Sequence, residues 1–373
     1  MNGHGHRGKP RRATPGDIRR INRTLILQTL HRSDPMSRAD LARAVGLTPA
    51  AVSAVVRTLL ADGLVEEVGH AVGAIGKPAR LLAVDPDAVH IVALDISKGD
   101  ALVGGLVNLL GKLVQRQEVR LDGRTGEAAA AAVEQLAGSL IEAAERPVLG
   151  LGVGAPGIVA ADGVVVNAAH LSWTELPLGD RLRAETGVPV RVANDADAAA
   201  FGELTFGQAP DDNLLLVRVD VGVGAGLVLH RHLFSGDGFA TGEIGHTVVD
   251  PDGDLCACGK QGCLETLVSA PLLEPRLNAA GASERAAVIA SAGRHLGEAL
   301  AMVLSAVNVN EVVLSGSDDV ASETFRSAAA AAIAERTMPS IAAGVRIRPS
   351  TFGPDDVVVG AAALVTNDQL GLT

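Results

Sequence analysis

Residues 242–266 read "GEIGHTVVDPDGDLCACGKQGCLET" and hold every cysteine of the chain, Cys256, Cys258 and Cys263. A disulfide among them would leave one thiol over, whereas zinc accepts several thiolates in its tetrahedral shell of four ligands. The nearest fourth ligand is His246, and His230 and His232 on a preceding strand are alternatives. Three cysteines and one histidine leave no open position on the metal, so this loop predicts a structural zinc ion rather than a catalytic one.

The length and composition of the chain limit the class of protein. With 373 residues, 47% hydrophobic and 20% charged, it is long enough for two or three domains with full cores. It has no charge-free apolar run of about 18 residues, so a membrane span is not expected. The basic N-terminus is not followed by the apolar segment of a secretory signal. Together with the few cysteines, this predicts a protein of the reducing cytoplasm.

Charge is divided unevenly along the sequence. Residues 1–84 carry thirteen Lys/Arg against six Asp/Glu, a balance of +7, which leaves −18 for the rest of a chain whose total is −11. A basic head on an acidic body favours a polyanionic partner for the head alone. A solvated basic tail would give the same balance, and charge alone does not separate the two.

Residues 17–64 have the pattern of a helix-turn-helix. Apolar residues at helical spacing, Ile18, Ile21, Leu25 and Ile26, predict a first helix that ends before Pro35. A second, short helix begins at Ser37 and runs through Val45, and a third is capped by Thr48 with Pro49 at its first position. We expect an inward-facing set from the last two helices and the turn between them: Leu41, Val45, Leu47, Val52, Val56 and Leu59.

The segment after Gly63 predicts a two-stranded wing with glycines at its tip. A wing beside a basic helical pair indicates DNA binding, although the same turn also occurs in structural hairpins. The candidate DNA-contact residues are Ser37, Thr48, Ala51, Ser53, Ala54, Arg57, Lys77 and Arg80. The predicted domains are a disordered basic tail (1–16), a winged helix-turn-helix (17–84) and a larger body (85–373).

The body is predicted to be a duplicated α/β unit. Strand-like runs begin at His90, and an alanine-rich helix is expected over about 126–145. A similar opening recurs at "NLLLVRVDVGVGAGLVL", where Asp220 takes the place of Asp95 in the first copy. Two related openings favour two lobes with a cleft between them, whereas two unrelated hairpins would look much the same.

Several polar residues near the cysteine loop suit a polyol. Asn194 and Asp195 follow a predicted strand, and Glu243 and Glu265 flank the loop. Carboxylates and amides accept and donate paired hydrogen bonds to neighbouring hydroxyls. If His246 binds zinc through one ring nitrogen, the other nitrogen is free to bind a hydroxyl. The alternative interpretation of Asn194-Asp195 is a helix N-cap.

The spacing Glu243-x-Gly245-His246, followed by Cys256-x-Cys258-Gly259-x-x-Gly262-Cys263-x-Glu265, resembles the paired signature of the ROK family of repressors, open reading frames and kinases. The resemblance covers about residues 88–373, and residues 17–83 resemble the winged helix-turn-helix of the family's repressor branch. It implies a duplicated actin-like ATPase fold of the sugar-kinase type. It implies zinc held by His246, Cys256, Cys258 and Cys263. It also implies sugar contacts from Asn167, Asn194, Asp195, Glu243, His246 and Glu265. Asp195 matches the general base of the kinases.

Departures from the kinase pattern favour a regulator. The kinases carry D-x-G-G-T after the first strand, but this chain has Asp95-Ile96-Ser97-Lys98-Gly99, and its second loop begins Asp220-Val221-Gly222. A carboxylate at Asp220 would repel ATP phosphates, so both phosphate loops are degraded, over Ile96–Gly99 and Asp220–Val221. We therefore expect no enzyme activity, with Asp195 a vestigial base.

The leading hypothesis is a repressor, a homodimer or homotetramer, that releases operator DNA when a sugar or sugar phosphate binds. An ATP-dependent sugar kinase with an appended DNA-binding head is the first alternative. A zinc-stabilised scaffold without sugar affinity is the second. The recognition helix departs from the family's frequent T-V-S-R, since it reads Ala51-Val52-Ser53-Ala54. Ser53 and Arg57 are then its main polar readers, and DNA shape carries more of the specificity.

Overall fold

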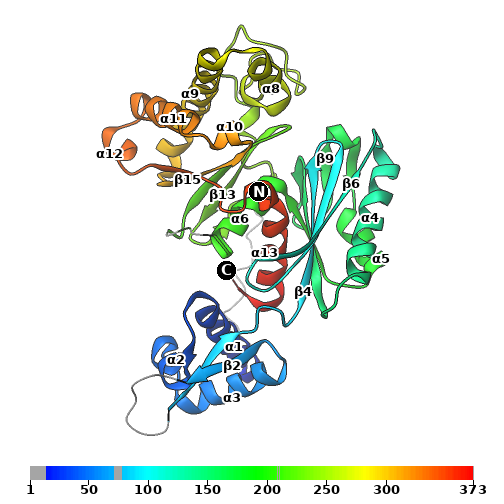
Figure 1. The fold of residues 1–373 in the computed structure, drawn as a ribbon, viewed down its shortest axis with the longest axis vertical. Coiled ribbons are helices and arrows are strands. Elements are labelled where there is room, and N and C mark those ends of the chain that lie inside the picture. Colours follow the sequence, from blue (N-terminus) through cyan, green and yellow to red (C-terminus); the bar gives the residue numbers. More distant parts are fainter. Residues whose placement is uncertain (1–13, 71–77, 208, 210, 373) are drawn as a thin grey trace, which may run out of the picture. The chain divides into compact units, whose positions relative to one another are not determined.

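The computed structural model describes residues 14–70, 78–207, 209 and 211–372. The chain divides into two compact units. Met1–Ala88 together with Leu370–Leu372 form the first unit, and Val89–Gln369 form the second (Figure 1). Most of the predicted N-terminal tail lies outside the described residues, but Thr14 already caps the first helix.

The first unit contains three helices, α1 (Pro15–Arg32), α2 (Arg38–Val45) and α3 (Pro49–Ala61). Ser37 caps α2, and its hydroxyl accepts from the Asp40 backbone N–H. Thr48 caps α3 in the same way. The chain turns by 114° between α2 and α3. This angle and the short connection are those of a helix-turn-helix, so the predicted motif is confirmed.

The core of the first unit is built from one face of each helix. Leu41, Val52, Val56 and Leu59 are fully buried, as predicted. Val45 and Leu47, expected to face inward, are only half-buried. On α1 only one of the four residues that predicted the helix faces the core: Ile26 is fully buried, whereas the exposed ones are Ile18, Ile21 and Leu25. The helical spacing of these four residues was predicted correctly, but they lie at the edge of the buried face of α1, so that only Ile26 is covered.

A small sheet completes the winged motif. Its strands are β1 (Met36–Ser37), β2 (Val65–His70) and β3 (Arg80–Val84), in the order β1-β3-β2. Strands β2 and β3 pair antiparallel from Val65 opposite Val84 to His70 opposite Arg80. The predicted wing tip, with Lys77, lies outside the described residues.

The C-terminal segment Leu370–Leu372 belongs to the first unit, not the second. The Gln28 side-chain amide on α1 donates to the Gly371 carbonyl at 2.6 Å. Gly371 has φ +72° and lies against Thr24, so only glycine fits there without strain. Leu372 is fully buried. The first unit is therefore completed by residues from the far end of the chain.

The second unit has two lobes built to one plan. Strand order in the first lobe is β11-β7-β4-β5-β6, and in the second β14-β13-β12-β15-β16. In each lobe the first strand in sequence pairs antiparallel with the next strand and parallel with a later one. The duplication predicted from the two similar openings is thus confirmed. The first-lobe strands are β4 (His90–Lys98), β5 (Ala101–Val107), β6 (Leu113–Arg120), β7 (Val148–Ala155) and β11 (Val190–Asn194). Those of the second are β12 (Leu214–Val219), β13 (Val223–Leu229), β14 (His232–Leu233), β15 (Glu311–Gly316) and β16 (Arg346–Pro349).

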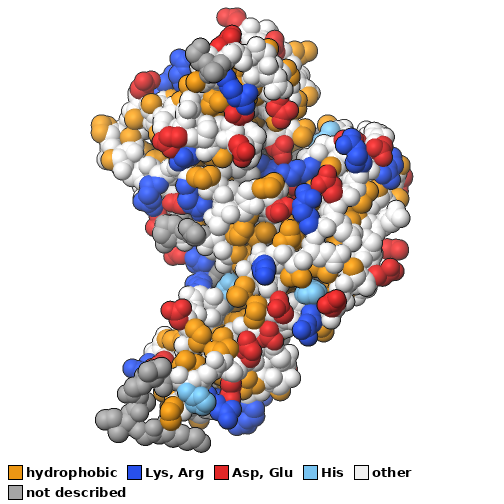
Figure 2. All heavy atoms as spheres, viewed as in Figure 1, with side chains coloured by type: hydrophobic (Ala, Val, Ile, Leu, Met, Phe, Trp, Pro, Cys, Tyr) orange, Lys and Arg blue, Asp and Glu red, His pale blue; other side chains and the backbone are white. Residues whose placement is uncertain are grey.

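Helices and a small sheet surround these two sheets. In the first lobe they are α4 (Gly126–Glu142), α5 (Leu178–Thr186) and the strands β8 (Ile158–Val159), β9 (Val165–Ala168) and β10 (Trp173–Leu176). In the second lobe they are α7 (Glu265–Val268), α8 (Ala270–Ala279), α9 (Ala282–Val307), α10 (Asp318–Ala321), α11 (Glu323–Arg336) and α12 (Pro339–Ala342). Acidic and basic side chains are interspersed over the visible face of this unit (Figure 2).

Helix α9 is long and apolar enough by composition to cross a membrane. Its apolar side is instead part of the second-lobe core, where Leu296, Leu300 and Leu304 are fully buried. A Cβ at Gly293 would lie 2.3 Å from the Phe325 carbonyl oxygen, so α9 packs directly against the backbone of α11. Its hydrophobicity is accounted for by this packing.

Two further helices, α6 (Asp195–Thr205) and α13 (Asp356–Leu370), cross in direct backbone contact. A Cβ at Gly360 would lie 1.9 Å from the Ala198 carbonyl oxygen, and one at Gly202 would lie 2.8 Å from the Gly360 Cα. No side chain fits between the helices at this point. The crossing fixes the N-terminal residues of both helices, Asp195 and Asp356, relative to each other.

Candidate functional site

The predicted metal ligands come together in the second unit. His246 and the three cysteines place their ligand atoms within 4.8 Å of one another. The Cys258 and Cys263 sulfurs are 3.6 Å apart, and the Cys256 sulfur is 3.5 Å from His246 Nδ1. The alternatives are not in this cluster: His232 Nδ1 contacts the His230 carbonyl instead. His246 is therefore the fourth member of the group.

These distances fit a four-coordinate ion. Tetrahedral bonds of about 2.3 Å to sulfur and about 2.0 Å to nitrogen place two sulfurs about 3.8 Å apart and a sulfur about 3.5 Å from a nitrogen. Burial raises the pKa of the Cys263 thiol to about 12, so this thiol needs a neighbouring cation in order to ionise near neutral pH. The donor set therefore suits a metal ion that prefers thiolates.

The ring of His246 has its second nitrogen turned toward a carboxylate. Nδ1 faces the sulfurs, while Nε2 lies 3.8 Å from Glu243 Oε2. A metal bound at Nδ1 would hold the ring still and leave Nε2 directed toward the Glu243 carboxylate. The arrangement that the sequence suggested, one nitrogen for the metal and one for a ligand, is geometrically available.

Asn194 and Asn167 lie on either side of one glycine. The Asn194 side chain caps α6, with Oδ1 accepting from the backbone N–H groups of Ala196 and Asp197, and its Nδ2 donates to the Gly157 carbonyl at 2.9 Å. A Cβ at Gly157 would lie 2.1 Å from the Asn167 carbonyl oxygen. The N-cap alternative for Asn194 is thus what the structure has, while the Asn167 side chain stays exposed.

Three half-buried carboxyl groups of the site, those of Asp195, Asp197 and Glu243, lie close to one another. Burial raises the pKa of Asp195, against the effect of Arg218, whose Nε lies 3.1 Å from its Oδ2. Burial, with the charges of Asp195 and Glu243, raises the pKa of Asp197 to about 7. Burial also raises the pKa of Glu243. These carboxyl groups can accept, or when protonated donate, hydrogen bonds to hydroxyls.

Glu265 completes the group from the first turn of α7. Its Oε2 accepts from the Val223 backbone N–H at 3.1 Å. A Cβ at Gly222 would lie 2.9 Å from the same oxygen, so Gly222 lets the carboxylate approach the loop. The second oxygen of Glu265 has no hydrogen bond to any described residue. Asp195, His246 and Glu265 all act electrostatically on Glu243, so these four predicted ligand residues lie close together. Asn194 precedes Asp195 in the chain, and the place of Asn167 in the group stays a prediction.

The two loops that resemble phosphate loops are tied to each other. Lys98 Nζ lies 3.3 Å from Asp220 Oδ2, and Gly99 lies against the Val221 side chain. Asp95, at the heart of the first loop, is fully buried and accepts from the Ser97 backbone N–H and hydroxyl. Side chains of the protein itself thus occupy the space where these loops face one another.

In the first unit, α3 presents the predicted DNA-reading face. Thr48, Ala54 and Arg57 are exposed, and Ala51 and Ser53 are half-buried. No ion pair joins Arg57 to any other described residue. Two other candidates are already engaged: Ser37 is buried as the α2 cap, and the Arg80 guanidinium pairs with Glu67.

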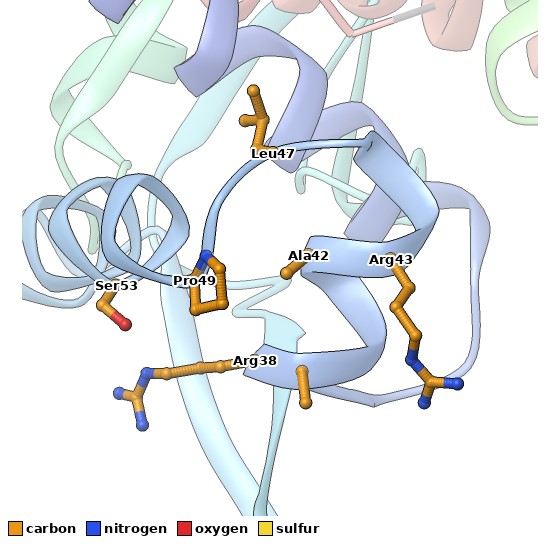
Figure 3. Close-up of a pocket in the computed structure, with 7 residues that line it drawn as sticks. Arg38, Ala42, Arg43, Leu47, Pro49 and Ser53 are labelled. Carbon is orange, nitrogen blue, oxygen red and sulfur yellow. The ribbon is translucent and has the colours of Figure 1, made fainter.

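A groove of about 520 Å³ lies between α2 and the start of α3. Arg38 extends along its floor beneath Pro49 toward the side that carries Ser53, and Arg43 stands at its other end (Figure 3). Arg38 also pairs with Glu67 at 3.1 Å, so this glutamate holds Arg38 and Arg80 together. The sequence did not single out Arg38 or Arg43.

Comparison with known proteins identifies the family. Residues 91–368 match the model of the ROK family, and residues 21–68 match that of the MarR family. The chain belongs to the ROK family. The predicted fold class, a winged helix-turn-helix followed by a duplicated actin-like unit, is confirmed.

Relatives of this ROK protein include both regulators and enzymes. It is 25% identical over 374 residues to the xylose repressor of Bacillus subtilis, over 95% of this chain and 97% of that protein. It is 30% identical over 317 residues to a glucokinase of Halalkalibacterium halodurans, over 74% of this chain and 95% of that one. The crystal structure of a ROK family transcriptional regulator, a homolog of the E. coli Mlc protein, superposes with a TM-score of 0.80 at 25% identity, over 95% of this chain and 98% of that one. The two regulators thus match both units.

Two residues of this ROK site were not found from the sequence. Asp197 lies within the stretch that was noted, but a second acid after Asn194-Asp195 looks like an ordinary first-turn residue. Arg218 lies on β12, in the apolar run "LLLVRVDVG" of residues 214–222. A single arginine among apolar residues was the only sign in the sequence that it has a special role. A charged residue in a fully buried strand needs partners, and those partners come from segments distant in sequence.

Proposed function

We propose that this ROK protein is a sugar-responsive transcriptional repressor that leaves its operator DNA when a sugar or sugar phosphate enters the cleft. The observation that carries the proposal is the presence of two parts in one chain. One is a winged helix with Thr48 and Arg57 exposed at α3. The other is a group of carboxyl and imidazole side chains around Glu243 that can hydrogen-bond to hydroxyls. Such a repressor acts in the cytoplasm, where its operator lies. For the ligand to act, it must bind the DNA-released state more tightly, typically by about 1–3 kcal/mol.

The contact between the two segments that resemble phosphate loops favours a regulator over a kinase. Phosphoryl transfer depends on loops that cradle phosphates and on charge that stabilises the transferring group. Here Asp95 and Asp220 present carboxylates, and the Lys98 ammonium that could offset them is held between the two. An ATP phosphate would have to displace that contact and face the Asp220 carboxylate, which the kinase pattern lacks. Loss of kinase activity follows from this arrangement.

The metal of the Cys3His cluster is proposed to be zinc, with a structural role. Thiolates and imidazole in a closed tetrahedron suit Zn²⁺. The ion would be held by His246, Cys256, Cys258 and Cys263, and it would fix the loop between residues 246 and 263 and the direction of the His246 ring. The metal would thus support the hydroxyl-binding residues without touching the ligand. These residues are proposed to be Asn167, Asn194, Asp195, Glu243, His246 and Glu265.

Operator binding is assigned to α3 and the groove beside it. Thr48, Ser53 and Arg57 face outward from the helix, with Ala51 and Ala54 between them. A homodimer or homotetramer would place two such helices on half-sites about 10 base pairs, or a multiple of that, apart. Phosphate contacts by basic residues would supply most of the affinity and make it fall with salt.

The test is fluorescence anisotropy of a labelled duplex from upstream of the protein's own gene. The protein is titrated onto the duplex, and then D-xylose, D-glucose, N-acetyl-D-glucosamine and the 6-phosphates of the two hexoses are added singly. One of them should weaken binding 5–150-fold, the range of typical coupling energies of about 1–3 kcal/mol, and Glu243→Gln should remove the response. Glu142→Gln, at an exposed position of α4, is the matched control and should respond as the wild type does.

The same panel separates the alternatives. ATP turnover that depends on a sugar and disappears in Asp195→Asn would establish the kinase and contradict the repressor proposal. DNA binding that ignores every sugar, together with a melting temperature that no sugar raises, would favour the zinc-stabilised scaffold. Release of DNA by one sugar without any ATP turnover is the result expected of the repressor.

A further inference from the structure

Arg218 lies at the centre of a ring of carboxylates inside the second unit. It is 3% exposed. Its Nη2 lies 2.6 Å from Asp220 Oδ2, and its Nη1 lies 3.2 Å from Asp356 Oδ1. Its Nε lies 3.1 Å from Asp195, and the Asp95 carboxylate is 3.9 Å from Nη2. One guanidinium therefore serves four carboxyl groups.

These contacts join both lobes and both crossing helices. Arg218 belongs to β12 of the second lobe, and Nη2 also donates to the Ser97 hydroxyl on β4 of the first lobe at 3.3 Å. Asp195 begins α6 and Asp356 begins α13, the two helices that touch at Gly360. The planar fork of five N–H donors is suited to holding several carboxylates in fixed directions at once. The guanidinium thus contacts residues of both lobes and links them.

The ring has more carboxyl groups than cations, and burial raises the pKa of two of them, Asp195 and Asp356. Four carboxylates face two cations, Arg218 and Lys98. Asp95 is fully buried, and its Oδ2 has no hydrogen bond to any described residue. Buried charges without partners cost several kcal/mol each. The ring therefore needs a cation at its centre.

Without the arginine, this ring would have the composition of a magnesium site. Mg²⁺ prefers carboxylate oxygens and keeps several waters. The ring reaches solvent through Lys98 and Asp220, whose side chains are 22% and 28% exposed, so an ion with its waters has a way in. The centre that a divalent cation would take is filled by Arg218 in the native chain.

We propose that Arg218 is a built-in cation that occupies a latent divalent-metal site and so clamps the two lobes without metal or nucleotide. It is a positioning residue: it holds Asp195 on the wall of the ligand cleft and touches no ligand itself. The native unit should accordingly be indifferent to Mg²⁺, and loss of the guanidinium should create Mg²⁺ dependence. This holds whether or not the cleft binds a sugar, so its test does not depend on the proposed function.

The experiment is thermal unfolding of the full-length protein, followed by fluorescence of Trp173, the only tryptophan of the chain, which lies in the second unit. Arg218→Met should lower the melting temperature in the absence of Mg²⁺. Addition of 10 mM MgCl₂ should then raise it by about 5 °C if the ion binds about a hundredfold below that concentration. The wild type should shift by less than about 1 °C.

Three further variants isolate the cause. Arg348→Met removes another arginine of the second lobe, which pairs with Glu203 and Glu311, and should be destabilised without any response to Mg²⁺. Arg218→Lys keeps a cation at the centre and should also not respond. Arg218→Met combined with Asp220→Asn removes one ligand and should respond more weakly than Arg218→Met alone.

If Arg218→Met does not fold, its soluble yield should recover when Mg²⁺ is present during refolding, and that of Arg348→Met should not. An Arg218→Met protein that neither shifts with Mg²⁺ nor recovers with it overturns the proposal. So does a wild type that shifts as much as the variant.

Discussion

Asp197 gives the site a pH dependence that can be measured through stability. Burial raises its pKa from 3.8 to about 7 in the folded protein. Between these two values the folded state holds a proton that the unfolded state has lost, so stability falls as pH rises from about 4 to about 7. A difference of about 3 pKa units at about 1.4 kcal/mol each is about 4 kcal/mol. Asp197→Asn, which has the same shape without the charge, should recover about that amount at pH 8.

The assay is urea unfolding followed by Trp173 fluorescence, with linear extrapolation at pH 4, 5.5, 7 and 8. No tyrosine is present to complicate the signal. The advantage of the variant should be near zero at pH 4, about 2 kcal/mol at pH 5.5, and should level off above pH 7. An advantage of equal size at every pH, or one that grows toward low pH, would refute the reasoning, because neither can come from a carboxyl whose pKa is raised.

Three other predictions concern the metal, the DNA-reading face and the helix crossing. Cys258→Ser should lose one equivalent of zinc by elemental analysis and melt at a lower temperature, whereas His232→Ala should keep its zinc. Arg57→Ala should weaken operator binding and reduce the slope of log K against log salt concentration by about 1, while Arg146→Ala, exposed on the second unit, should change neither. Gly360→Ala should cost about 1–3 kcal/mol in urea unfolding because its Cβ meets the α6 backbone. Gly138→Ala, at a helical position with open space around it, should gain about 0.5–1 kcal/mol.

Local signals in the sequence predicted the elements well. The caps at Ser37 and Thr48 begin α2 and α3 where the sequence placed them. The expected helix over about 126–145 is α4, Gly126–Glu142. The cysteine spacing identified the cluster, because the ligands lie close together along the chain as well as in space. In each case the determining contacts are within a few residues of one another.

The long-range contacts could not be predicted from the sequence. Ile18, Ile21 and Leu25 share the helical spacing of Ile26, but which side of α1 is covered depends on where the other elements pack. Apart from Asp220, two residues along the chain, the partners of Arg218 come from three separate segments, up to 138 residues away. The periodicity of apolar residues predicts that one face of a helix is apolar. Which elements pack against that face is known only from the folded structure.

The C-terminal segment of the first unit has a consequence for how the protein is made. Gln28 and its partner Gly371 are 343 residues apart, so a ribosome synthesises the second unit before it reaches the Leu370–Leu372 segment of the first unit. Until then the place of Leu372 in the core of the head is empty. A nascent chain or a prematurely terminated one therefore carries an unfinished head. The second unit is therefore synthesised in full before the first unit can be completed by Leu370–Leu372.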